Sequence, residues 1–237
     1  MYQSLLYIVF FVILNLNPMQ MKVIEVEKLK FSTARPDLDE ISLSLDRNVK
    51  KEAVDVLNWS DFSYKPDVSF AIAYTDNEIL LKYYVTEEYF KAEKTRSNQG
   101  VYEDSCVEFF VSPSDDGIYY NFEVNGIGTI LLGTGTERAN SRTVDPEIIS
   151  KIRRKSSVGD QPVSERTGNF SWNITIAIPF EVFFRHEVRD LKGKTFRANF
   201  YKCGDKLTVP HYVTWNPINT PNPDYHRPEF FGLLKFK

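Results

Sequence analysis

Cysteine is scarce in this 237-residue sequence, which contains only Cys106 and Cys203. No C-x-x-C pair occurs, so the spacing of a cysteine zinc centre or of a thioredoxin-like redox motif is absent. A bridge between the two cysteines would suit an exported protein, but sequence does not show that their backbones approach closely enough. The alternative of two buried free thiols on strands stays equally open.

An excess of positive charge is also absent. The chain carries 29 Lys and Arg against 32 Asp and Glu, which gives a formal net charge of -3. Proteins that bind phosphate backbones present a basic footprint, because cationic side chains must neutralise the phosphates. We therefore expect no nucleic-acid partner.

Hydrophobic runs of comfortable membrane-spanning length are lacking as well. The apolar run "SLLYIVFFVILNL" within residues 1–20 is short for a bilayer span but suits the core of a signal peptide. No Lys or Arg precedes it, "NPMQM" offers no small-x-small cleavage site, and "MKVIEVEKLKF" from Met21 is typical of a second translation start. The sequence slightly favours export to the periplasm or the exterior, with a cytoplasmic protein that starts at Met21 as the alternative. In both cases residues 1–20 lie outside the fold, and no stable membrane insertion is expected.

Aromatic residues, in contrast, are abundant and favour β structure. They make up 14% of the chain, with 18 Phe and 13 Tyr, and flat rings fit a pleated, half-buried surface. "VSFAIAYTDNEILLKYYVTE" contains two apolar runs around "TDNE", which predicts a hairpin. Alternation with period two predicts further strands in "SCVEFFVSP", "IYYNFEVNGIGTILLGTG", "FSWNITIAIPFEVFF" and "TFRANFYKCGD".

These runs predict an all-β fold, a single antiparallel β-sandwich of the immunoglobulin or jelly-roll type over residues 21–237. A chain of this length can bury a sizeable core, and all-β sandwiches of this size commonly form one domain. The region between Gly133 and Gly168 is unpatterned and rich in Arg, Ser and Thr, so we interpret it as one long insertion. Within it "DPEIISKIRRK" predicts a short helix, and few other helices are expected.

One predicted strand, "YYNFEVNG", carries a row of polar side chains on one face. Successive side chains of a strand point to opposite faces, so Asn121, Glu123 and Asn125 share a face. Such a row is either a solvated outer face or a set of groups for sugar hydroxyls, which both donate and accept hydrogen bonds. The sequence leaves both interpretations open.

A second strand, "YEDSCVEFFV", places Glu108 on the same face as Cys106 and Phe110. A partly buried carboxylate must find a partner or change its protonation state. A structural hydrogen bond and a ligand contact both satisfy this requirement. Arg96, in the polar loop "KTRSNQG", could supply the opposite charge or reach a sugar oxygen itself.

The order of several segments resembles the carbohydrate-binding family 9-like proteins, relatives of the DOMON β-sandwiches. The segments that carry the resemblance are "WSDFSYKPDVSFAIAY", "YEDSCVEFFV", "YYNFEVNGIGT", "WNITIAIPFEVF", "NFYKCGD", "YVTWNPI" and "DYHRPEFFG". The resemblance implies a β-sandwich that binds saccharides, often attached to or encoded with enzymes that degrade plant polysaccharides. It therefore predicts a carbohydrate ligand, with glycoside hydrolases as the implied partners.

The resemblance also implies where the sugar-binding residues fall. In the family two tryptophans sandwich a terminal sugar, while an acid, an arginine and an asparagine bond its hydroxyls. The positions that match these groups here are Tyr102, Glu108, Glu123, Asn125, Asn222 and Tyr225 or His226. Both tryptophans are replaced by smaller rings and the arginine by an acid, so the family's preference for the reducing ends of glucan or xylan chains is not carried over. Tyrosine still offers an aromatic face, so a sugar platform is retained.

The C-terminal segment "HYVTWNPINTPNPDYHRPEFFG" divides into core and site residues. Trp215 lies in an apolar strand and is expected in the core. The prolines after it predict a rigid extended loop that returns across the mouth of the sandwich. We expect this loop to expose Tyr225 and His226 and to be pinned to the core by Phe230 and Phe231.

The sequence thus predicts non-catalytic carbohydrate binding, with no cofactor. The predicted ligand-binding residues are Arg96, Tyr102, Glu108, Asn121, Glu123, Asn125, Asn222, Tyr225 and His226. A structural calcium ion in the turn "SPSDDG", through Asp115 and Asp116, is an option that the family allows. The alternatives are a glycoside hydrolase that uses Glu108 and Glu123, and a sandwich that binds protein. A zinc site from Cys203, Asp205, His211 and His226 matches no standard spacing.

Overall fold

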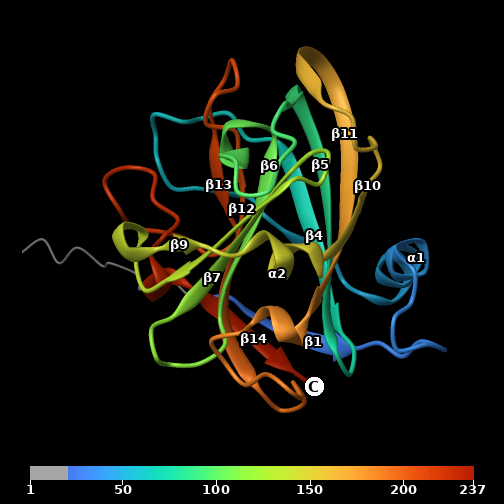
Figure 1. Ribbon diagram of the computed structural model, residues 1–237. Coiled ribbons are helices and arrows are strands. Elements are labelled where there is room, and N and C mark those ends of the chain that lie inside the picture. The colour runs from blue at the N-terminus through green and yellow to red at the C-terminus, as the bar shows by residue number, and fades with distance from the viewer. Residues whose placement is uncertain (1–20) are drawn as a thin grey trace, which may run out of the picture.

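The computed structural model describes residues 21–237, and their fold is mostly β (Figure 1). The two α-helices are α1 (Leu38–Asn48) and α2 (Pro146–Ser150). The strands are β1 (Val23–Lys28), β2 (Glu52–Ala53), β3 (Val56–Leu57), β4 (Asp67–Tyr74), β5 (Glu78–Ala92), β6 (Cys106–Ser112), β7 (Tyr119–Asn125), β8 (Ile130–Gly135), β9 (Arg142–Thr143), β10 (Arg153–Ser156), β11 (Val163–Pro179), β12 (Thr195–Cys203), β13 (Tyr212–Thr214) and β14 (Gly232–Phe236). The predicted all-β sandwich is confirmed. The predictions about a signal peptide or a start at Met21 concern residues 1–20, which lie outside the described residues.

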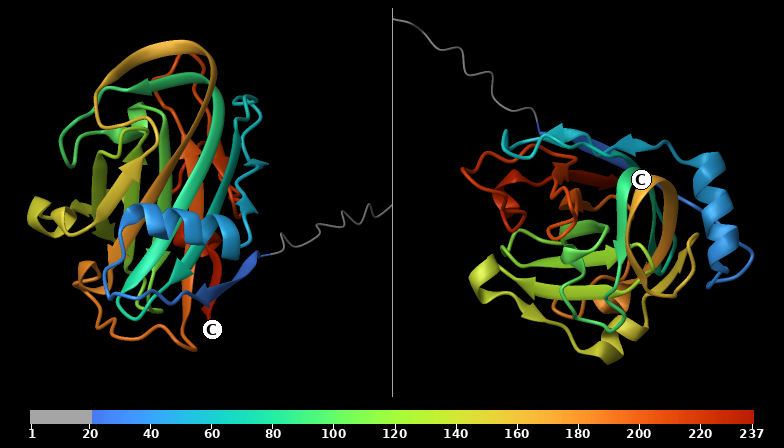
Figure 2. Two further views of the ribbon diagram at one scale, coloured as in Figure 1. Left: turned by 90° about the vertical axis from the view of Figure 1, so that its right-hand side faces the viewer. Right: turned by 90° about the horizontal axis from the view of Figure 1, so that it is seen from above.

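The strands form two layers that β1 joins (Figure 2). Along the hydrogen-bonded order, β10, β11, β5 and β4 form one layer, and β14, β12, β6, β7, β8 and β9 form the other. β1 pairs in parallel with β4 and with β14, so it makes the two layers continuous, and β10 and β9 lie at the two ends of the hydrogen-bonded order. The pairing is antiparallel elsewhere, and β1 is the exception to the predicted antiparallel pattern.

The core lies between the two layers and is rich in aromatic rings. Phe70 of β4 stacks on Phe200 of β12 with ring centroids 3.7 Å apart, and Phe200 in turn stacks on Phe109 of β6 at 5.0 Å. Trp215 is 1% exposed and meets Phe200 edge-on, as predicted for a core residue. Because burying each large apolar side chain contributes about 1.5–3 kcal/mol, this stack holds β12 and β6 firmly against the other layer.

A second apolar cluster lies on the opposite face of β6, β7 and β12. The alternation of side chains turns Cys106, Phe110, Tyr119 and Tyr201 away from the main core. The C-terminal segment covers this face, with Tyr225 and Phe231 buried in the cluster. The prediction that the segment crosses the mouth of the sandwich is therefore wrong, since it packs on the outer face of one layer. Phe231 is the predicted anchor, and half-buried Phe230 packs beside it.

Helix α1 is a regular element that the sequence analysis did not predict. The Asp37 side chain accepts hydrogen bonds from the backbone N–H groups of Asp39 and Glu40, which caps the helix. Ile41 and Leu45, four residues apart, are fully buried in a small cluster that includes residues of β4 and β5. The helix covers the outside of the β4–β5 layer, away from the C-terminal segment (Figure 2).

The region between Gly133 and Gly168 is more regular than predicted. It contains the predicted short helix, as α2, but also β9, β10 and the start of β11. The first half of β11 is largely exposed, so its residues have no apolar period, and pairing with β5 extends it instead. Tertiary pairing therefore supplied a strand that periodicity could not indicate.

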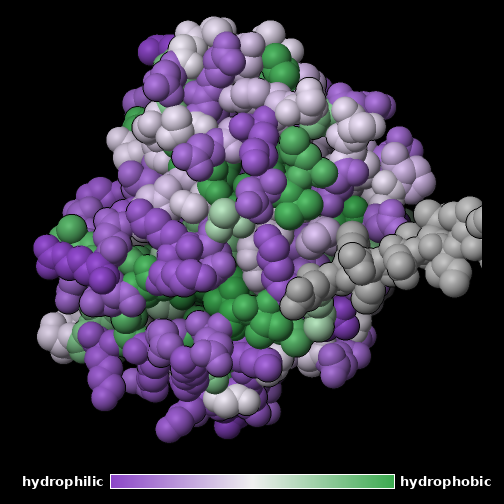
Figure 3. Space-filling model, turned by 180° about the vertical axis from the view of Figure 1, so that it is seen from behind, coloured by the Kyte–Doolittle hydropathy of each residue, from purple (hydrophilic) through white to green (hydrophobic). Residues whose placement is uncertain are grey.

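The face seen from behind is predominantly polar. From behind, hydrophilic side chains dominate and hydrophobic ones gather in smaller areas between them (Figure 3). Exposed apolar side chains of this kind are common on folded proteins and indicate no site by themselves. Among residues 21–237, no helix has the length and apolar character needed to cross a membrane.

Candidate functional site

A pocket of about 220 Å³ opens on the outer face of β6, β7 and β12. Its lining combines carboxyl groups, aromatic rings and one guanidinium group. The lining residues are Tyr102, Glu108, Glu123, Arg138, Asp205, Tyr212, Pro223, Asp224, Tyr225 and His226. Pockets for drug-sized ligands are typically about 300–1,000 Å³, so this smaller volume suits about one sugar residue.

Two carboxyl groups, Glu108 and Glu123, form the floor of the pocket, which we call the carboxyl floor. They face each other directly across β6 and β7 and are 3% and 5% exposed. Glu108 Oε1 accepts a hydrogen bond from Cys203 Sγ at 3.0 Å, and Glu123 Oε1 accepts one from Asn121 Nδ2 at 2.9 Å. Glu123 Oε2 has no hydrogen-bond partner among the described residues. A buried acceptor of this kind is costly unless a ligand completes it.

Burial raises the pKa values of both floor carboxyl groups. Loss of hydration disfavours the carboxylate form, and Glu123 adds a repulsion that raises the pKa of Glu108 further. Burial is the largest cause that raises the pKa of Glu123 to about 7, and repulsion from Asp205 adds to it. Near neutral pH the floor can therefore take up or release protons when a ligand enters.

Tyr225 forms a buried wall of the pocket. Its ring stacks on Tyr201 of β12 with centroids 4.0 Å apart, and its hydroxyl donates to the Lys202 carbonyl at 3.1 Å. Only 6% of the residue is exposed, because the C-terminal segment is pressed against the sheet. The expectation that the loop exposes Tyr225 is therefore wrong, although its ring does line the pocket.

His226 lines the pocket beside Tyr225 and is held in place. Its Nδ1 lies 2.7 Å from the Tyr119 hydroxyl, and its ring meets Phe110 edge-on. Burial, with a smaller contribution from Arg138, lowers the pKa of His226 to about 4. The ring is consequently neutral at physiological pH, and it offers a hydrogen-bonding edge without charge.

The rim of the pocket contains residues that were not among the predicted sugar-binding residues. Arg138 donates through Nη2 to Asp224 Oδ1 at 2.9 Å, and this ion pair joins the loop after β8 to the C-terminal segment. Asp205 follows β12, and burial raises its pKa to about 6. Tyr212 comes from β13. Asp205 and Tyr212 lie in the segments "NFYKCGD" and "HYVTWNPI", but Arg138 lies in the unpatterned region, where no sequence signal marked it.

The structure brings five of the nine predicted ligand residues to this pocket. Tyr102, which is 39% exposed, lies at the rim in the short helical turn Val101–Glu103 and completes the set of Glu108, Glu123, Tyr225 and His226. Whether these residues bind a sugar stays a prediction.

The other four predicted residues do not line the pocket. Asn121 supports Glu123 from behind, as described above. Asn125 is fully buried and donates to Asp104 Oδ2 and the Lys94 carbonyl. Arg96 and Asn222 are exposed on loops. The polar row on β7 is thus a buried, hydrogen-bonded layer and not a solvated surface, and Glu123 is its one member that reaches the pocket.

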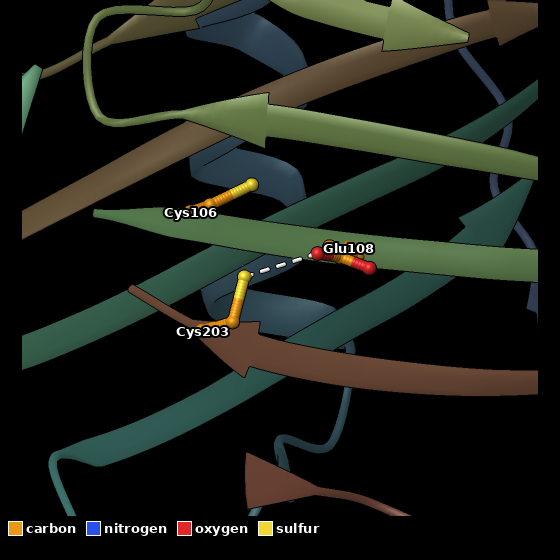
Figure 4. Close-up of side chains that lie close together, drawn as sticks. All are labelled: Cys106, Glu108 and Cys203. Carbon is orange, nitrogen blue, oxygen red and sulfur yellow. Dashed lines mark hydrogen bonds between the residues drawn. The ribbon is translucent and has the colours of Figure 1, made fainter. Parts of the chain in front are cut away.

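Cys106, Cys203 and Glu108 form a compact cluster under the pocket (Figure 4). The two cysteines face each other across β6 and β12, and both are free. Burial raises the pKa of Cys106 to about 12, and burial also raises the pKa of Cys203 well above its usual range. Cys203 Sγ, the donor to Glu108 Oε1, thus serves as a buried hydrogen-bonding group beneath Glu108.

In the turn proposed to bind calcium, the Asp116 side chain contacts other groups of the protein. Asp116 accepts a hydrogen bond from the backbone N–H of Ile118 and lies 3.1 Å from His186 Nε2. Among residues 21–237, no group of three metal-ligating side chains forms at this turn, nor from the four residues considered for zinc. The calcium site stays a prediction.

The raised pKa values predict that stability falls as pH rises. Folded Glu123 holds its proton up to about pH 7, whereas an ordinary glutamate releases it near 4.5, so the stabilising proton is lost within this window. Glu123→Gln should remove about 2–3 kcal/mol of the stability difference between about pH 5 and about pH 8. Urea unfolding of the parent and of Glu123→Gln at both pH values measures this difference in unfolding free energy. Asp160→Asn, which removes an exposed carboxyl group, is the control and should keep the parent's pH dependence. An unchanged pH dependence in Glu123→Gln would contradict the buried, protonated floor.

Comparisons with known proteins agree on one family. A family model described as Carbohydrate-binding family 9 matches residues 39–236. A solved structure from Bacteroides uniformis ATCC 8492, to which carbohydrate binding has been attributed, is 43% identical with a TM-score of 0.89 and covers 92% of this chain and 100% of that one. A family 9 carbohydrate-binding module from Caldicellulosiruptor kristjanssonii, solved with glucose and with cellotriose, matches at TM-scores of 0.57 and 0.55 with 16% and 14% identity, covering 91% of this chain and 96% and 94% of those chains. No curated protein matches the chain.

Proposed function

The chain belongs to carbohydrate-binding family 9, and from this membership we propose that it binds a saccharide without cleaving it, in the pocket above the carboxyl floor. The observation that carries the proposal is the lining of that pocket. Tyrosine rings at the rim and wall offer apolar faces for a pyranose, and buried carboxyl groups below them accept hydrogen bonds from hydroxyls. The family 9 module of similar fold binds glucose and cellotriose, which supports a saccharide as the ligand class.

The ligand is proposed to be part of a poly- or oligosaccharide in a polysaccharide-degrading system. The pocket volume of about 220 Å³ suits one sugar residue, so the rest of a longer chain would extend into solvent past Tyr102. A bound partner enzyme, a glycoside hydrolase, would then be held near its substrate.

Addition of this protein should raise the rate of a matched hydrolase on insoluble polysaccharide, and an unchanged rate would argue against the partnership.

The direct test is a glycan array on the protein that begins at Met21, followed by calorimetry on each hit. Mass spectrometry of the bound glycan after prolonged incubation separates binding from cleavage. We expect at least one intact glycan to bind. The absence of any bound glycan would overturn the proposed function.

Glycoside hydrolysis is the second candidate, because Glu108 and Glu123 are paired carboxyl groups in one pocket. Hydrolases of this type need one protonated and one ionised carboxyl group. Here burial raises the pKa of both, and the guanidinium that lines the pocket is bonded to Asp224. Membership of a carbohydrate-binding family favours binding over catalysis, and cleavage products in the mass spectra would reverse that conclusion.

Tyr102→Ala is expected to weaken binding of the sugar hit about tenfold, because the ring would no longer cover one face of the sugar. Tyr102 is 39% exposed, so the variant should keep the parent's unfolding free energy to within about 0.5 kcal/mol. Calorimetry measures the affinity. Asn222→Ala is the matched control, since Asn222 is exposed in a nearby loop but does not line the pocket. If Tyr102→Ala and Asn222→Ala bind the sugar with equal affinity, Tyr102 does not contact it and the sugar binds at another place.

A further inference from the structure

The pocket contains more acidic groups than the cations that line it can neutralise. Its lining includes the carboxyl groups of Glu108, Glu123, Asp205 and Asp224, against the single guanidinium of Arg138. Arg138 bonds Asp224 through both Nε and Nη2, at 3.2 and 2.9 Å. Three carboxyl groups in the pocket are therefore left without a lining cation of their own.

A buried lysine close by does not supply the missing charge. Lys202 lies on β12 next to Cys203, but its ammonium is bonded to Glu87 at 2.8 Å and to His211 at 2.8 Å. Its side chain is 0% exposed and is not part of the pocket lining. Lys202 thus belongs to a separate buried network.

Glu123 carries an acceptor that is ready for a ligand. One of its oxygens is fixed by Asn121, whereas Oε2 is buried and has no partner among residues 21–237. The side chain is 5% exposed and lines the pocket floor. An unpaired acidic oxygen at the bottom of a sugar-sized pocket requires a donor, and a charged donor satisfies it best.

We propose that the pocket selects amino sugars, that is, saccharides whose free amine is protonated, with the ammonium group placed against Glu123, Glu108 and Asp205. This inference rests on the proposed function and names its ligand class. An ammonium group has three N–H donors and no acceptor, which matches a group of acceptor-only carboxylates. Its charge also compensates the acidic groups that Arg138 leaves unpaired.

The protonation state of the floor supports the same conclusion. Burial favours the protonated forms of Glu108 and Glu123 in the free protein, and repulsion from Glu123 adds to this effect at Glu108. Arrival of a cation favours the carboxylate forms, so binding should release protons into the buffer. A neutral sugar would leave those protons in place. Proton release therefore distinguishes the two ligand classes independently of affinity.

The test compares glucosamine, galactosamine and mannosamine, each with its parent hexose and its N-acetyl derivative, by calorimetry at neutral pH. We expect one amino sugar to bind at least about tenfold more tightly than its parent hexose and its N-acetyl derivative. The affinity for this amino sugar should fall at high salt, because salt screens its charge. Its binding enthalpy should vary with the ionisation enthalpy of the buffer, as proton release requires. Glu123→Gln should reduce the preference to about twofold or less, while Asp160→Asn, on an exposed loop, should keep it.

The outcomes separate this inference from the proposed function. Neutral sugars that bind as tightly as the amino sugars, with no proton release, overturn the inference and leave saccharide binding intact. Failure of every monosaccharide and of every glycan on the array overturns both. A preference for amino sugars that Glu123→Gln leaves unchanged overturns the placement of the ammonium group against the carboxyl floor.

Discussion

Replacement of Lys202 by methionine should destabilise the protein by about 3–5 kcal/mol, since it would leave Glu87 buried without its cation. The two side chains are completely buried and their charged atoms lie 2.8 Å apart. Lys202 Nζ also donates to the Cys203 carbonyl at 2.8 Å, and Glu87 Oε1 accepts from Trp172 Nε1 at 2.7 Å. The network connects β5, β11 and β12 through the interior, so the loss should appear in urea unfolding as a lower midpoint.

Two controls distinguish a buried ion pair from a general effect of losing a lysine. Lys50→Met removes a lysine that is 84% exposed and pairs with Glu52, and it should cost less than about 1 kcal/mol. The double variant Lys202→Met with Glu87→Gln keeps an acceptor for Trp172 but removes the buried charge, so it should recover much of the lost stability. If Lys202→Met proves no more costly than Lys50→Met, the ion pair does not hold the strands as we infer.

The second large effect is expected at Tyr225. Tyr225→Ala should lower the free energy of unfolding by about 3–5 kcal/mol, because it removes a buried ring that stacks on Tyr201. The same change removes a wall of the pocket, so sugar binding should fall with it. The sequence analysis expected the C-terminal loop to expose Tyr225, and its buried position in the structure reverses that expectation.

Tyr225→Phe separates the role of the ring from that of the hydroxyl. It keeps the stacked ring and loses only the hydroxyl, which donates to the Lys202 carbonyl at 3.1 Å and lies 3.4 Å from the Val213 carbonyl. It should therefore cost about 1 kcal/mol and retain most sugar affinity. Urea unfolding and calorimetry on both variants measure the two effects. A Tyr225→Ala protein as stable as the parent would show that the C-terminal segment does not depend on this ring for its place on the sheet.

The sequence by itself determined the fold class, the family and the two acidic positions of the pocket floor. Strand periodicity is a local property, because alternate side chains must face opposite sides whatever the rest of the chain does. Glu108 was identifiable for this reason, as a charged group on the same strand face as Cys106 and Phe110. Glu123 was identifiable as the acid in a row of polar side chains on one face. Trp215 was placed in the core by the same argument, and the structure agrees.

Only the tertiary structure decided which polar residues meet at one site. Asn121 and Asn125 have the same strand period as Glu123, but Asn121 bonds Glu123 itself and Asn125 bonds Asp104 and the Lys94 carbonyl, so both are buried structural groups. Arg138 lies in the unpatterned region after β8, and its bond to Asp224 of the C-terminal segment holds it at the pocket. Such contacts join residues far apart in the chain, and their formation depends on how loops pack on the sheet. Local patterns carry no record of that packing, so the charge balance of the pocket emerged only from the folded arrangement.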